Sequence, residues 1–80
     1  MNVEDLKIGS KITLEGNREF RIVDIRKEEN KDYIVCCTNS KPILPIIFEY
    51  KVDGDKIKVR AEKDKKILES ICKKMIKENS

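Results

Sequence analysis

The residue types that carry most enzyme and metal chemistry are scarce in this chain. None of its 80 residues is histidine, which is the commonest general base and the commonest nitrogen ligand of metals. The three cysteines lack the number and the paired spacing of a structural zinc site, and three dispersed glycines form no phosphate-binding loop. We therefore expect no catalytic residue, no metal and no cofactor, and we predict that the protein is not an enzyme.

The cysteines are better explained as small apolar residues. Adjacent residues of a strand point to opposite faces, so Cys36 and Cys37 should separate, one inward and one outward. We expect the inward one and Cys72 to be core residues, because free cysteine is among the most buried residue types. The odd number of thiols also argues against a disulfide framework.

Length and composition indicate one small domain over residues 1–80. Hydrophobic residues make up 39% of the chain and charged residues 41%, and the apolar residues recur with regular periods. The longest apolar run, from Ile43 to Phe48, is interrupted by Pro45 and is too short to cross a bilayer. The start of the chain is acidic, unlike a signal peptide. We therefore expect a cytoplasmic protein without membrane contact.

The first half of the chain has the alternation of antiparallel strands. Residues 11–15 alternate polar and apolar, and a turn at 16–18 would set Leu14 opposite Phe20 and Ile12 opposite Ile22. In the next strand, residues 19–27, two apolar neighbours indicate either burial on both faces or a bulge before Ile25. Residues 33–37 are rich in β-formers and are typical of a central strand.

The second half predicts a hairpin and then a helix. A turn at Asp53-Gly54, with positive φ at Gly54, would close the last hairpin. It would pair Tyr50 with Ile57, Phe48 with Val59, and Ile46 with Ala61.

The last segment changes from the strand period to the helix period. Asp64 is a suitable N-cap, and an apolar stripe follows it that we expect to cover the sheet of its own chain rather than a partner. The stripe consists of Ile67, Leu68, Ile71, Cys72, Met75 and Ile76. The fold class is therefore α+β: a five-stranded antiparallel meander or half-barrel covered by one C-terminal amphipathic helix. Its parts are a lead-in at 1–10, antiparallel strands over 11–61, and the helix at 62–79.

Two families share short patterns with this chain. The stretches at 16–25, 32–36 and 48–55, which include Glu19-Phe20 and Asp53-Gly54-Asp55, resemble a domain-of-unknown-function family of short proteins from low-GC Gram-positive bacteria. That resemblance implies a fold of strands with a closing helix and transfers no active site. The run Leu6-Lys7-Ile8-Gly9, continuing into the first strand, is similar to the opening of SH3-like barrels. Such barrels bind peptides or nucleic acids.

Two functions of different classes follow. The apolar stretch at 42–47 exceeds what one sheet face can bury, so Leu44 and Ile47 are the candidates for an exposed partner surface, unless the C-terminal helix or the lead-in covers them. This favours a protein-interaction or regulatory module whose partner is another protein or a second copy of the chain.

The alternative is a weak nucleic-acid-binding SH3-like domain. The last forty residues hold 11 Lys or Arg and 7 Asp or Glu, and Lys56, Lys58 and Arg60 share the outer face of the final strand. Interspersed acids and only four Phe or Tyr residues weaken this alternative, since bases stack on aromatic rings. The richness in lysine also accompanies many Ile and Asn residues, as in proteins encoded by A/T-rich genomes.

Overall fold

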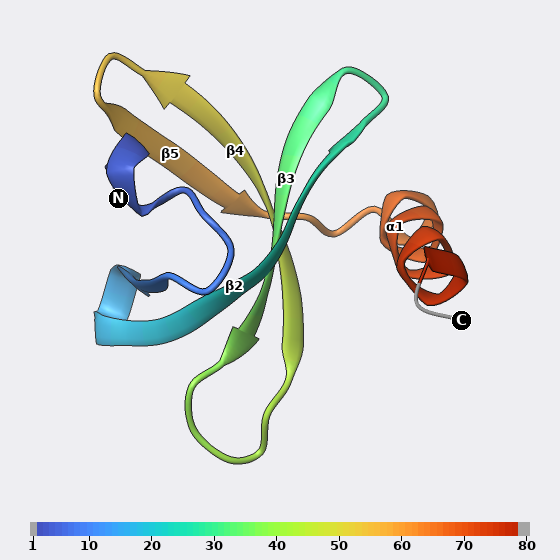
Figure 1. The fold of residues 1–80 in the computed structure, drawn as a ribbon, viewed down its shortest axis with the longest axis horizontal. Helices are drawn as coiled ribbons and strands as arrows, with labels where there is room; N and C mark the ends of the chain where they lie inside the picture. Colours follow the sequence, from blue (N-terminus) through green and yellow to red (C-terminus); the bar gives the residue numbers. More distant parts are fainter. Residues whose placement is uncertain (1, 79–80) are drawn as a thin grey trace.

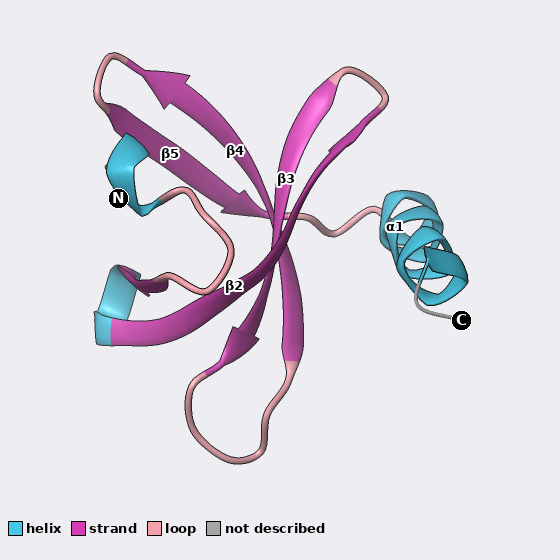
Figure 2. Cartoon of the chain, viewed as in Figure 1, coloured by secondary structure: helices cyan, strands magenta, loops and turns pink. Residues whose placement is uncertain are grey.

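Five antiparallel strands follow one another along the chain and pair in that same order, as Figures 1 and 2 show. The computed structural model describes residues 2–78, so the ends of the predicted lead-in and helix, at residues 1 and 79, lie outside it. The sheet curls into a half-barrel, and one helix follows, which confirms the predicted fold class. The elements are β1 (Lys11–Leu14), β2 (Arg18–Glu28), β3 (Lys31–Thr38), β4 (Pro45–Asp53), β5 (Lys56–Ala61) and α1 (Lys65–Glu78).

A bulge in the long strand β2 bends the sheet. Ile22 lies opposite Cys36 and Asp24 lies opposite Val35, so Val23 has no partner in the ladder and is 41% exposed. The extra residue shifts the phase of the strand, and Ile25 joins the same core as Ile22. The bulge is the second of the two arrangements that the sequence left open. Because a bulge increases the local twist, it helps the sheet to curl.

The curled sheet has an apolar core on each face. The concave face holds the larger core, in which the rings of Phe20 and Phe48 meet edge to face with centroids 5.5 Å apart. The central strand β3 serves both cores: Ile34 and Cys36 belong to the concave core, and Tyr33 belongs to the convex one. The predicted central strand is thus confirmed, with buried side chains on both of its faces.

Helix α1 covers the convex face. Ile71 has no exposed surface and packs with Tyr33, Val35 and Ile47. Asp64 caps the helix by accepting a hydrogen bond from the Lys66 N–H at 2.9 Å, as the sequence predicted.

The convex core corrects two expectations. Ile47 is only 6% exposed, so the prediction that it forms part of a partner surface is wrong, because the helix lies on it. The apolar stripe is also narrower than expected. Cys72 is exposed, Ile76 is 70% exposed, and only Ile67, Leu68 and Met75 pack around Ile71.

Both predicted hairpin registers are wrong by two residues. Ile12, not Leu14, lies opposite Phe20. In the last hairpin Tyr50 lies opposite Val59 and Phe48 opposite Ala61.

The position of the last turn accounts for the second error. The turn consists of Gly54 and Asp55, and of these two only Gly54 has positive φ, at 66°. This combination is typical of a type II′ turn, in which glycine occupies the first central position. The positive φ of Gly54 itself is confirmed.

The lead-in closes one end of the half-barrel. It contains a short 3-10 turn, Val3–Asp5, and its Leu6 packs against the concave core. The Val3 N–H donates to the Asp55 carbonyl at 3.0 Å, and the Gly9 N–H donates to the Ile22 carbonyl at 2.8 Å. The lead-in therefore spans from the start of β5 to the middle of β2, as Figure 1 shows.

Two isoleucines of α1, the buried Ile71 and the exposed Ile76, provide a matched test of the helix packing. We expect Ile71→Ala to lower the free energy of unfolding by about 2 to 5 kcal/mol, because it opens a cavity in the convex core. Ile76→Ala removes the same atoms from an exposed site and should change the free energy of unfolding by less than about 0.5 kcal/mol. Urea unfolding measures both, and equal effects would contradict the packing of α1.

Candidate functional site

The half-barrel leaves two strands with a free edge, β1 and β5. The direction of the backbone groups of β5 follows from its hydrogen bonds to β4. The Glu62 N–H donates to the Ile47 carbonyl at 2.9 Å, and the direction of these groups alternates along an antiparallel strand. The N–H and C=O groups of Lys58 and Arg60 therefore point toward β4. Those of Val59 and Ala61 point away from the sheet.

Most of the β5 edge is uncovered. The lead-in reaches only its start, where Asn2 forms an antiparallel bridge with Lys56. Within residues 2–78, the outward backbone groups of Val59 and Ala61 form no hydrogen bond to another element. The bridge at Lys56 shows that extended backbone fits against this edge, and the uncovered part offers the same geometry to another segment.

A groove of about 730 Å³, lined by both apolar and polar side chains, lies beside this edge. Phe20 and Phe48 form part of its lining, and they are only 2% and 7% exposed. The rest of the lining comes from β1, the start of β2 and β5, namely Thr13, Leu14, Arg18 and the run from Ile57 to Ala61. Its volume is within the range of sites that bind small molecules or a few peptide side chains.

Arg18 occupies the part of the groove that the β1–β2 turn forms. Its guanidinium carbon lies 5.2 Å from the centre of the Phe20 ring, which is a cation–π distance. Arg18 and Phe20 also line a second hollow of about 360 Å³, which the β1–β2 and β3–β4 loops form. The groove is therefore lined by apolar and basic side chains together, with Arg18 on one side and residues of β5 on the other.

The three predicted basic residues lie together, on the outer face of β5 beside the free edge. Arg60 donates to the buried Glu49 at 3.0 Å, and Lys58 lies 3.6 Å from Asp53. The side chains of Arg60 and Lys58 are nevertheless 76% and 78% exposed. Lys58 and Arg60 therefore each have one acidic neighbour on β4, and most of the surface of each side chain remains accessible.

Leu44, the other predicted partner residue, lies in the β3–β4 loop. It is 55% exposed, and its neighbour Ile43 is 64% exposed. The Leu44 N–H donates to the Thr38 hydroxyl at 2.8 Å, which fixes the loop backbone. Leu44 does not line the groove beside β5, and Ile47 lies on the other side of the sheet beneath α1.

The nucleophilic side chains form no constellation with these features. Burial raises the pKa of Cys36 to about 12, so this thiol stays protonated at neutral pH. Burial and the hydrogen bond to Glu62 raise the pKa of Tyr33 to about 12. Among residues 2–78, no group of three or more His, Cys, Asp or Glu side chains is placed to hold a metal ion. No helix in this range is both long and apolar enough to span a membrane.

No family model, curated protein or solved structure matches this chain. The two resemblances noted in the sequence therefore stay predictions. The groove and the β5 edge are the features of the fold that bear on function.

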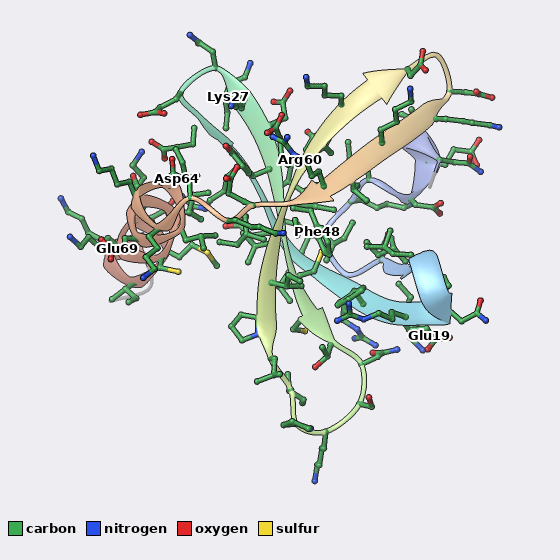
Figure 3. All side chains as sticks on the ribbon, turned by 180° about the vertical axis from the view of Figure 1, so that it is seen from behind. Glu19, Lys27, Phe48, Arg60, Asp64 and Glu69 are labelled. Carbon is green, nitrogen blue, oxygen red and sulfur yellow. The ribbon has the colours of Figure 1, made fainter. Side chains whose placement is uncertain are left out.

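The sequence contains signals for the basic face and for part of the groove lining, but not for the free edge. The alternation of bases and apolar residues in β5 correctly places Lys58 and Arg60 on one face. Figure 3 labels Arg60, which comes from β5, and Phe48, which comes from the neighbouring strand β4. The accessible backbone of Val59 and Ala61 depends on β5 being the last strand of a sheet that does not close. Only the pairing order establishes that property.

Proposed function

We propose that this protein is a cytoplasmic, non-enzymatic interaction module that binds an extended segment of another protein along β5. The segment adds a strand to the β5 edge and places alternate side chains in the groove beside it. The observation that carries this proposal is the open edge at Val59 and Ala61 next to the groove. Strand addition uses backbone hydrogen bonds for affinity and side-chain pockets for specificity. The open edge of β5 offers the backbone groups, and the groove offers a pocket.

The lead-in supports this mode of binding from within the chain. Asn2 already pairs with Lys56, and Val3 donates to Asp55, so extended backbone lies against the start of β5. An incoming segment can continue this pairing along the strand without displacing the lead-in. It also satisfies backbone groups that water alone can reach in the free protein.

Nucleic acid is the second candidate, and Arg18 favours it, because an arginine at the mouth of the groove can contact a base or a phosphate. Two observations weaken it. Phe20 and Phe48 are buried, so they present no ring face on which a base can stack. Glu49 and Asp53 lie beside Arg60 and Lys58 and reduce the positive potential of the outer face.

Proline at position 59 tests strand addition directly. The Val59 N–H points away from the sheet, so Val59→Pro removes a donor from the free edge and leaves the ladder to β4 intact. We expect peptides selected from an unbiased phage-displayed library to lose about tenfold in affinity for this variant. Fluorescence anisotropy with the synthetic peptides measures the loss.

Val59→Ala is the matched control, because it shortens the side chain and keeps the N–H group. It should weaken binding less than Val59→Pro does, and circular dichroism should show that both variants are folded. If folded Val59→Pro binds the selected peptides as tightly as the unsubstituted protein, they do not add to the β5 edge.

A salt titration with fluorescent oligonucleotides separates the two candidate functions. We expect weak or no binding of single-stranded DNA or RNA at physiological salt, because acidic side chains lie among the bases. Submicromolar binding at that salt, with an affinity that falls steeply as salt increases, would favour the nucleic-acid function instead.

A further inference from the structure

The two faces of β5 differ in a way that specifies the chemistry of an added strand. Val59 and Ala61 pack toward the concave core, and Lys58 and Arg60 lie on the opposite, outer face. Residues that lie directly opposite each other in neighbouring strands share a face. An added strand therefore has one set of side chains toward the groove and the other set beside Lys58 and Arg60.

We infer that the bound segment alternates apolar and acidic residues, with its apolar side chains in the groove and its carboxylates against Lys58 and Arg60. This inference rests on the proposed function and adds the chemical class of the partner. Opposite charges across a ladder stabilise the pairing, and like charges destabilise it. Lys58 and Arg60 each have one acidic neighbour on β4, but both are more than three-quarters exposed, so each can reach a second carboxylate on an added strand.

The same arrangement acts against pairing with a second copy of the chain. Bases and apolar residues alternate along β5. When two antiparallel copies of β5 pair with their apolar side chains on the same face, the bases of one copy therefore lie opposite the bases of the other. A pair centred on Val59, for example, places Lys58 of each copy opposite Arg60 of the other. Charged edge strands commonly prevent such association, so the basic face selects an acidic segment over the protein itself.

Charge reversal at Lys58 tests this inference. The probes are two blocked peptides of equal length, one alternating Glu and Val and the other alternating Lys and Val. We expect the Glu peptide to bind the unsubstituted protein about tenfold more tightly than the Lys peptide, and Lys58→Glu to reverse this preference. Calorimetry gives the affinities, and amide chemical shifts of Val59 and Ala61 give the position of binding.

Lys73→Glu is the matched control. Lys73 is exposed on α1 and does not line the groove beside β5. This variant has the same net charge as Lys58→Glu and should keep most of the preference for the Glu peptide.

The outcomes separate the inference from the proposed function. If both peptides bind equally and shift the amides of Val59 and Ala61, strand addition stands and the acidic preference is wrong. If the Glu peptide binds without shifting these amides, both are wrong. If Lys73→Glu and Lys58→Glu change the preference equally, the bases act through overall charge, and the assignment to Lys58 is wrong.

Discussion

A five-stranded sheet that curls without closing is the constraint on which the rest of this structure depends. The curl, helped by the bulge at Val23, buries Phe20 and Phe48 on the concave face and leaves the convex face for α1 to cover. Because the sheet does not close, β1 and β5 each keep one edge with unpaired backbone groups. The groove lies between these two edge strands, so the candidate site is a direct consequence of the architecture.

The sequence of β5 is suited to an open edge. Its apolar residues face the concave core, and its bases face outward. There Arg60 forms an ion pair with Glu49, and Lys58 forms one with Asp53. Charge on an edge strand discourages pairing with identical edges and leaves pairing with an oppositely charged strand favourable. One arrangement of charge thus protects the free protein from self-association and gives the proposed site its specificity.

The sequence predicted the elements well and their registers poorly, for one physical reason. Alternation along a strand fixes which face a residue occupies, but shifting a hairpin by two residues leaves every face unchanged. The sequence therefore predicted the positive φ of Gly54, but it paired the residues of β4 with residues of β5 two positions away from their true partners. The burial of Ile47 was left undecided, because the pattern of one strand cannot reveal that α1 packs on its second face. The free backbone of β5 depends on pairing order, which no local pattern encodes.

Amide hydrogen exchange in the free protein tests the central claim most directly. The account predicts alternation along β5: slow exchange at Lys58 and Arg60, whose N–H groups point toward β4, and fast exchange at Val59 and Ala61, whose groups point outward. Two-dimensional NMR after transfer into D₂O resolves these four amides. Equal protection of all four would show that the β5 edge is already covered and would contradict its role as the binding site.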